Sequence, residues 1–222
     1  MSVRQKKVNT ACIFNPSILD RNLKGLTQFH PIDSWSRFQP QEEDVVMSLT
    51  PAEIQKVRHG IWQRDIVAII YRLARGLDRC DKELLQTCFH EGATDDHGLF
   101  KGDALEFCDW VINELGKYER TQHFISNVNI KFDNETARTE AYFFAHHVVP
   151  GEAGKKDVIA AGRYLDQFEL RNDEWKIVHR KALYDWSRVD ETKDGWSAPP
   201  ISEILTRGQQ GKDDLSYDFF DR

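Results

Sequence analysis

The sequence predicts an α+β fold in which one strongly curved, mainly antiparallel sheet wraps around helices that precede it in the chain. Two observations carry this prediction. Between about residues 50 and 116, apolar residues recur at three- and four-residue steps, which is the period of amphipathic helices. After residue 120 the period changes to two, over long stretches that turn-forming residues separate. The length of 222 residues leaves room for one such core with extensions at its ends.

The first helix has the clearest local signal. Thr50 can cap it, Pro51 suits the first helical position, and Glu53 completes a capping box. The apolar periodicity that follows predicts one or two amphipathic helices, which run to about residue 77. The other expected helices are residues 81–88 and a helix that opens with a capping pair, Asp103 and Glu106, and stops at Gly116.

Four long strands are expected after the helices. They are residues 121–132, 136–149, 157–170 and 174–188. Turn-forming pairs separate them at Asp133-Asn134, Pro150-Gly151 and Asn172-Asp173. Because each turn is short, neighbouring strands are expected to pair antiparallel in a meander.

The chain is expected to have three parts. Residues 1–49 contain many large apolar side chains without a sustained period, which favours an arm that packs across the domain or onto a neighbouring subunit. Residues 50–189 form the α+β barrel domain. Residues 190–222 contain Pro199-Pro200, Gly208 and Gly211, and are expected to run over the surface as a C-terminal extension.

Composition narrows the classes of function. A net charge of −6 argues against nucleic-acid binding, which clustered Lys and Arg drive. No apolar run approaches the roughly 18 residues that cross a bilayer, and the charged start of the chain has no hydrophobic block behind it. The spacing of the four cysteines does not match that of metal ligands, so we expect them to be reduced thiols. We therefore expect a soluble, cytoplasmic protein.

Motifs for bound cofactors are missing from the sequence. It contains no GxGxxG, HExxH or GxSxG, and the lysine-containing loop at 151–156 lacks the spacing of a phosphate loop. His90, Asp95, Asp96 and His97 have the residue types of a metal site, but a hydrogen-bonded turn at 95–98 is the commoner structure. The rings of His146 and His147 are expected on opposite faces of a strand. No cofactor and no metal are expected.

Five motifs in order carry a family resemblance. They are YRLARGLD (71–78), DHG (96–98), TQHFISN (121–127), GRYLD (162–166) and WKIVHR (175–180). Together, over roughly residues 60–189, the chain resembles the SnoaL-like family of the nuclear transport factor 2-like superfamily. This resemblance implies a cone-shaped barrel with a deep apolar pocket. Family members include scytalone dehydratase, dehydrochlorinases, polyketide cyclases and lyases that release formaldehyde from lignin-derived diaryl compounds, all without a cofactor.

The resemblance implies a catalytic pair. Asp78 matches the helix-borne carboxylate of the family, and His123 matches its catalytic histidine. A carboxylate that fixes the tautomer of an imidazole and stabilises the imidazolium suits proton transfer. The residues alone leave two alternatives open: Asp81, which also suits a helix cap, in the place of Asp78, and a purely structural role for Asp78 and His123.

Further candidate site residues lie on the predicted strands, and Tyr71 lies on the first predicted helix. Strand alternation puts Asn127 on the side of His123, and Arg180, Tyr184 and Trp186 on one face of the last strand. Arg180 is the expected third catalytic residue, because the dehydrochlorinase pattern has an arginine there; Arg163 competes with it, and a structural ion pair is the alternative for both. The expected substrate-binding residues are Tyr71, His97, Asn127, Tyr142, Arg163, Tyr184 and Trp186.

The family resemblance and these candidate residues together predict a cofactor-independent lyase that acts by general acid–base catalysis on a hydrophobic aromatic or polycyclic small molecule. Dehydration and formaldehyde-releasing C–C cleavage both fit this machinery. The alternatives are an isomerase or cyclase with the same pair, and a noncatalytic ligand-binding or oxygenase small-subunit-like module. Because apolar outer faces need cover, we expect a homo-oligomer, with a trimer favoured over a dimer, and no nucleic-acid or membrane partner.

Overall fold

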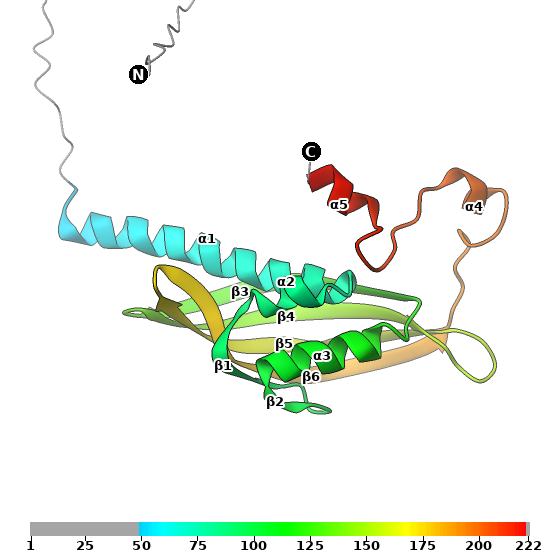
Figure 1. The fold of residues 1–222 in the computed structure, drawn as a ribbon, viewed down its shortest axis with the longest axis horizontal. Coiled ribbons are helices and arrows are strands. Elements are labelled where there is room, and N and C mark those ends of the chain that lie inside the picture. Colours follow the sequence, from blue (N-terminus) through cyan, green and yellow to red (C-terminus); the bar gives the residue numbers. More distant parts are fainter. Residues whose placement is uncertain (1–48, 221–222) are drawn as a thin grey trace, which may run out of the picture. The chain divides into compact units, whose positions relative to one another are not determined.

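The computed structural model describes residues 49–220, and Figure 1 shows the arrangement of their elements. The helices are α1 (Pro51–Asp78), α2 (Lys82–Gln86), α3 (Ala104–Leu115), α4 (Ile201–Ile204) and α5 (Leu215–Phe220). The strands are β1 (Phe89–Asp96), β2 (Lys101–Asp103), β3 (Arg120–Asp133), β4 (Thr136–Val149), β5 (Lys156–Arg171) and β6 (Glu174–Glu191). The arm predicted for residues 1–49 lies outside the described residues, apart from Leu49.

Helix α1 confirms the predicted capping box. The Thr50 hydroxyl accepts a hydrogen bond from the Glu53 backbone N–H at 3.3 Å, and the Glu53 carboxylate accepts one from the Thr50 backbone N–H at 2.8 Å. The helix then runs without interruption for 28 residues, so the predicted one or two helices are one. In its second half, from Ile66 to Leu77, one side of the helix is buried against the core. This long, anchored helix carries Asp78 at its last position.

The described strands form one six-stranded sheet in the order β2-β1-β6-β5-β4-β3. All neighbours pair antiparallel except β1 and β6, which are parallel. The four long strands confirm the period-two prediction. Figure 1 shows α3 lying over the sheet and α1 running along β3. The structure therefore has the α+β class that the sequence predicts.

Strands β1 and β2 correct the sequence prediction, which placed only a turn at residues 95–98. Asp95 and Asp96 belong to β1, and the tight turn between β1 and β2 begins at His97. The pairing of β1 with β6 shifts between Phe89 and Thr94, where Gly92 adopts a φ of 75°. This irregularity interrupts the alternation of side chains, so the short strand lacks the period of two that identifies the others.

The core lies between the helices and one face of the sheet. On β4 the alternate residues Ala137, Thr139, Ala141, Phe143 and Ala145 are buried, as a period of two requires. Ala137 and Ala141 belong to one hydrophobic cluster with the buried residues of α1 and α3, whereas Phe143 and Ala145 belong to a second, smaller cluster with Tyr164 and Ala182. The core-facing side of the sheet is called the inner face below, and the opposite side the outer face.

The C-terminal extension returns to the end of α1. The Asp214 carboxylate lies 3.2 Å from the Arg79 guanidinium, and the Tyr217 hydroxyl donates a hydrogen bond to Asp81 at 2.7 Å. The Gly211 backbone N–H donates to the Arg79 carbonyl at 2.7 Å. Several hydrogen bonds thus hold α5 and the loop before it beside the residues that follow Asp78.

Three thiols are free in the described chain. Cys88 and Cys108 are fully buried, and burial raises their pKa values to about 11 and about 12, so both stay protonated at neutral pH. Within residues 49–220, none of the helices has the length and apolar character needed to cross a membrane.

Candidate active site

The structure brings Asp78 and His123 together. Asp78 comes from the last residue of α1, and His123 from β3, which pairs with β4 at one edge of the sheet. Their side chains meet at 2.7 Å, between the Asp78 Oδ1 and the imidazole Nδ1. The second carboxylate oxygen accepts a hydrogen bond from the His123 backbone N–H at 3.0 Å. These two bonds form a His–carboxylate dyad, 45 positions apart in the sequence.

This geometry selects the tautomer of His123. An ionised carboxylate only accepts hydrogen bonds, so the ring must donate from Nδ1, and in the neutral ring the proton acceptor is then Nε2. The side chains are 7 % and 12 % exposed, for His123 and Asp78 respectively, which reduces the competition of water for the bond. Such a ring can accept a proton at Nε2 while Asp78 stabilises the resulting imidazolium.

A cavity lies beside the dyad, between the second half of α1 and β3. We call it the dyad hollow; its volume is about 310 Å³. It is lined by Tyr71, Ala74, Arg75, Asp78, Arg79, His123 and Ile125. Tyr71, a predicted substrate-binding residue, therefore shares a cavity with the dyad. The lining combines an aromatic ring and aliphatic groups with two guanidinium groups.

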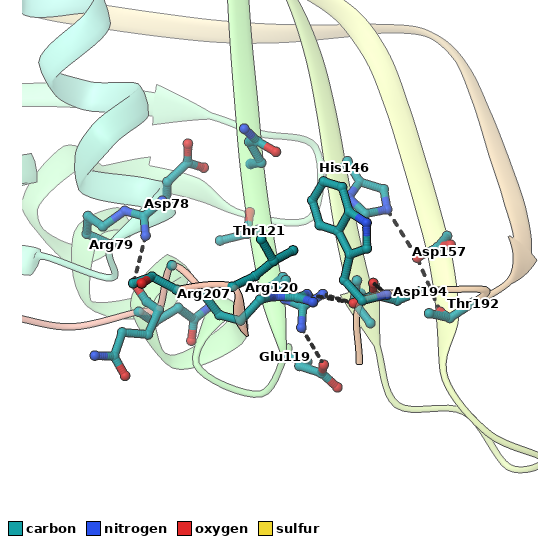
Figure 2. A pocket seen from close by; sticks show the side chains of 18 of the residues that line it. Asp78, Arg79, Glu119, Arg120, Thr121, His146, Asp157, Thr192, Asp194 and Arg207 are labelled. Atoms are coloured by element: carbon teal, nitrogen blue, oxygen red, sulfur yellow. Dashed lines mark hydrogen bonds and ion pairs between the residues drawn. The ribbon is translucent and has the colours of Figure 1, made fainter. Parts of the chain in front are cut away.

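A larger cavity of about 680 Å³ shares Asp78 and Arg79 with the dyad hollow. Figure 2 shows its lining, in which the ends of β3, β4 and β5 meet the C-terminal extension. Asp194 links the C-terminal extension to β3, because its carboxylate lies 2.6 Å from the guanidinium groups of both Arg120 and Arg207. Hydrogen bonds from Arg207, Arg120 and Ser197 lower the pKa of Asp194. We call this cavity the tail hollow.

His147 is a site residue that the sequence analysis did not assign. Its ring lies 5.5 Å from the ring of His123, and its Nδ1 is 2.8 Å from the Thr121 hydroxyl. Burial, followed by the charges of His123 and His146, lowers the pKa of His147 to about 3, so the ring is neutral at physiological pH. His146 faces Asp157 instead, at 3.1 Å, which confirms that the two histidines point to opposite faces. Two signals could have identified His147 from the sequence: the alternation of side chains along β4, and the pairing of β4 with β3.

Arg180 lies elsewhere on the inner face. It is fully buried and forms two hydrogen bonds of 2.7 Å with Asp166 on β5, and its guanidinium lies 4.2 Å from the centre of the Tyr164 ring. Burial opposes the charge, but Asp166 outweighs it and raises the pKa of Arg180. Arg180 lines neither of the two hollows. Its catalytic role stays a prediction, and the ion pair with Asp166 matches the structural alternative.

His97 belongs to a second buried pair. Its Nδ1 lies 2.5 Å from the Asp95 carboxylate, and its ring stacks on Phe107 with centroids 4.5 Å apart. The other histidine of the candidate metal cluster, His90, contacts the Glu169 carbonyl at 2.9 Å. Among residues 49–220 there is no group of three or more His, Cys, Asp and Glu side chains that could hold a metal ion. His97 thus lies in the core and not in the lining of the dyad hollow.

Asn127 does not share the side of His123, and this corrects the predicted alternation on β3. The pairing of β3 with β4 shifts between Ser126 and Asn129, where Asn127 adopts a φ of 48° and is exposed. Such a bulge reverses the faces of the residues that follow. Ile125 and, beyond the bulge, Val128 and Ile130 accordingly all pack against the core.

A second bulge separates Tyr184 from Trp186, which were predicted on one face of β6. Gly162 of β5 pairs with Tyr184 and Ala161 pairs with Trp186, so Asp185 is the extra residue. Tyr184 packs against Phe143 of the inner face, with centroids 5.8 Å apart, whereas Trp186 packs against Phe144 of the outer face at 6.2 Å. The bulge thus overturns the predicted shared face.

The last two candidates lie away from the dyad. Arg163 forms ion pairs with Glu140 at 3.2 Å and with Asp185 at 3.1 Å, which is its structural alternative. Tyr142 pairs with Arg163 across β4 and β5 and is exposed between buried neighbours. Both side chains therefore belong to the outer face, where they do not line the dyad hollow.

A curved, mainly antiparallel sheet that covers N-terminal helices is the fold of the nuclear transport factor 2-like class of proteins, and in this chain a His–carboxylate dyad lies between the first helix and an edge strand. Within that class, the family model described as "SnoaL-like domain" matches residues 62–181, which is more than half of the chain. The chain therefore belongs to the SnoaL-like family, and the resemblance seen in the sequence is confirmed.

Solved structures share this fold at low sequence identity. A provisionally named scytalone dehydratase from Novosphingobium aromaticivorans is 18% identical, with a TM-score of 0.54 over 70% of this chain and 96% of that one. Hexachlorocyclohexane dehydrochlorinase LinA-type3 from Novosphingobium barchaimii is 13% identical, with a TM-score of 0.55 over 66% and 99%. A provisionally named aromatic ring hydroxylase from Novosphingobium aromaticivorans is 20% identical, with a TM-score of 0.50 over 58% and 91%. No curated protein matches the chain significantly.

Proposed function

We propose that this protein is a cofactor-independent lyase that uses the Asp78–His123 dyad for general acid–base catalysis on a hydrophobic aromatic or polycyclic small molecule. One observation carries the proposal: the dyad is fixed by hydrogen bonds of 2.7 Å and 3.0 Å, and it lines a hollow that also presents Tyr71 and Ile125. Family membership supports small-molecule chemistry on this fold, and dehydratase and dehydrochlorinase names occur among the structural neighbours.

The proposed chemistry needs a single proton shuttle. In a dehydration, Nε2 of His123 takes a proton from carbon, the C–O bond breaks as the double bond forms, and the departing oxygen receives a proton to leave as water. In a retro-aldol cleavage, Nε2 takes the proton of a hydroxymethyl group, the C–C bond breaks with release of formaldehyde, and the carbanion receives the proton. Asp78 stabilises the imidazolium in both reactions. Neither reaction consumes an oxidant or a reductant.

Product mass tests the proposal directly. Aromatic alcohols and diols, including lignin-derived diaryl compounds, would be incubated with the full chain, and the products analysed by mass spectrometry for loss of water or formaldehyde. His123→Ala should abolish either loss. His146→Ala is the matched control, because it removes a histidine of the neighbouring strand that faces Asp157. Equal turnover by the wild type and His123→Ala would refute the assignment.

The same experiment separates the alternatives. An isomerase or cyclase that uses the dyad would give a product of unchanged mass but changed retention, and this change would also depend on His123. A ligand-binding or oxygenase small-subunit-like module would leave every compound unchanged. Either outcome would replace the lyase assignment, since both differ from loss of water or formaldehyde.

We also propose that the protein is a homo-oligomer, with a trimer favoured over a dimer. Phe124, Phe144 and Trp186 form a row across the outer face, with neighbouring ring centroids 6.4 Å and 6.2 Å apart. The three side chains are 54%, 38% and 52% exposed. A contiguous aromatic surface of this kind is typical of a protein–protein interface. We call it the outer aromatic row.

A further inference from the structure

Arg75 is a cation in the dyad hollow to which the dyad chemistry assigns no role. It precedes Asp78 by three residues on α1, so the two side chains share one face of the helix. Both line the 310 Å³ hollow together with His123. Arg75 as a whole residue is half-buried.

Within residues 49–220, Arg75 forms no ion pair with a carboxylate, unlike the other arginines around the two hollows. Arg79 is paired with Asp214 at 3.2 Å. Arg120 and Arg207 share Asp194. The nearby carboxylate of Asp78 is directed at His123, which donates a hydrogen bond to each of its oxygens. The positive charge of Arg75 is therefore left without a negative partner in the described chain.

The C-terminal helix α5 holds this guanidinium in place. Its Nη2 donates a hydrogen bond to the Ser216 hydroxyl at 3.1 Å. Its Cζ lies 4.9 Å from the centre of the Tyr217 ring and 5.3 Å from that of Phe220. Contacts with a hydroxyl and with aromatic faces orient a guanidinium without neutralising it. Among residues 49–220 the bond to Ser216 is the one hydrogen bond of this guanidinium, which leaves its remaining N–H groups there as a planar set of donors.

We propose that Arg75 binds a carboxylate of the substrate, so that the substrate class is an aromatic carboxylate, and that α5 positions Arg75 for this contact. The inference rests on the proposed function of the dyad. A guanidinium and a carboxylate form paired, charge-assisted hydrogen bonds, and a partly buried site strengthens them. Tyr71 and Ile125 supply the apolar surface for the ring that carries the carboxylate.

Binding of small probes tests the inference without turnover. Benzoate and its neutral analogue benzamide would be titrated into the full chain at neutral pH, with the ring signals of His123 followed by NMR. The wild type should bind benzoate at least about tenfold more tightly than benzamide. Arg75→Gln should remove this preference, Arg75→Lys should retain part of it, and Tyr217→Ala should reduce it through the loss of positioning. Arg138→Gln, an exposed arginine of β4, is the matched control and should bind as the wild type.

Two results would overturn the inference: equal affinity of the wild type for benzoate and benzamide, or an unchanged preference in folded Arg75→Gln. The first comparison needs no variant, so it decides even where Arg75→Gln does not fold. A preference for phenolate over benzoate would also reject the carboxylate assignment. His123→Ala separates this inference from the proposed function. If that variant kept turnover while benzoate binding depended on Arg75, the dyad proposal would fail and the anion site would remain.

Discussion

Asp78 uses both of its carboxylate oxygens on one residue, His123, which it binds through the imidazole at 2.7 Å and through the backbone N–H at 3.0 Å. The first bond sets the tautomer of the ring, and the second fixes the strand that carries it. The carboxylate therefore connects the end of the long helix α1 to the edge strand β3. Because one group does both, a change at Asp78 affects the orientation and the protonation state of the same imidazole.

Asp78→Asn should lower kcat by about 100- to 10,000-fold, while the protein stays folded. The amide oxygen can still accept the backbone hydrogen bond, but an amide N–H toward Nδ1 favours the wrong tautomer. The measurement is kcat and KM on the substrate found by product mass, with circular dichroism as the check of folding. Asp133→Asn, at the exposed end of β3, is the matched control. A kcat close to that of the wild type would contradict a catalytic dyad.

His147→Gln should flatten the dependence of stability on pH. The pKa of His147 is lowered to about 3 in the fold, mainly by burial, against about 6.5 in the unfolded chain. Between these values the unfolded state binds the extra proton, so this residue makes the free energy of unfolding fall as the pH drops below about 6.5, by at most about 1.4 kcal/mol per pH unit. Above that pH its contribution is constant. Glutamine retains a hydrogen-bonding group beside Thr121 without titrating.

Urea unfolding between about pH 4 and pH 7 measures this effect. His146→Gln is the control, because His146 lies on the opposite side of β4 and is one-third exposed. If the free energy of unfolding fell with decreasing pH as steeply in His147→Gln as in the wild type, another group would be the cause of the acid sensitivity.

The regular parts of the fold could be predicted from the sequence because each rests on a local signal. Thr50 and Glu53 cap α1 through groups three residues apart, and the four long strands alternate over more than ten residues. Bulges cannot be predicted in this way. A residue is extra only relative to the strand it pairs with, and the sequence of the bulged strand alone does not show this. The bulges at Asn127 and Asp185 therefore reversed the predicted faces beyond them.

The dyad could be predicted only through the family resemblance. Strand and helix periodicity describe neighbouring residues and do not show contacts between residues 45 positions apart. The surroundings of the dyad were harder to predict. Arg75 acquires its neighbours only when α5, some 140 positions later, returns to α1. Arg180, by contrast, carries a family motif yet is paired with Asp166 in the core. A motif identifies a position in the fold, whereas the partner of a charged group depends on packing.

Gly162→Ala should destabilise the protein by several kcal/mol, about 3 or more. A Cβ at this position would lie 2.0 Å from the Leu183 carbonyl oxygen and 2.9 Å from the Phe143 ring. The oxygen belongs to the backbone of β6 beside the Asp185 bulge, so the clash requires a change in the pairing of β5 with β6. Urea unfolding gives the change in free energy. Gly60→Ala, where the new methyl group meets no atom within 4 Å, is the control and should be neutral or stabilising. Equal stability of the two variants would show that the strands adjust freely.

Phe144→Glu should convert the oligomer to a monomer. Phe144 is the middle member of the outer aromatic row, between Phe124 and Trp186, so a charge there would be desolvated in an interface formed by the row. Light scattering coupled to gel filtration would give the mass in solution, with three times 25.9 kDa expected for the wild type. Phe219→Glu is the matched control, because Phe219 is 76% exposed on α5 and should tolerate the same change. A wild-type mass of one chain, or a Phe144→Glu variant that keeps the wild-type mass, would exclude this row as the interface.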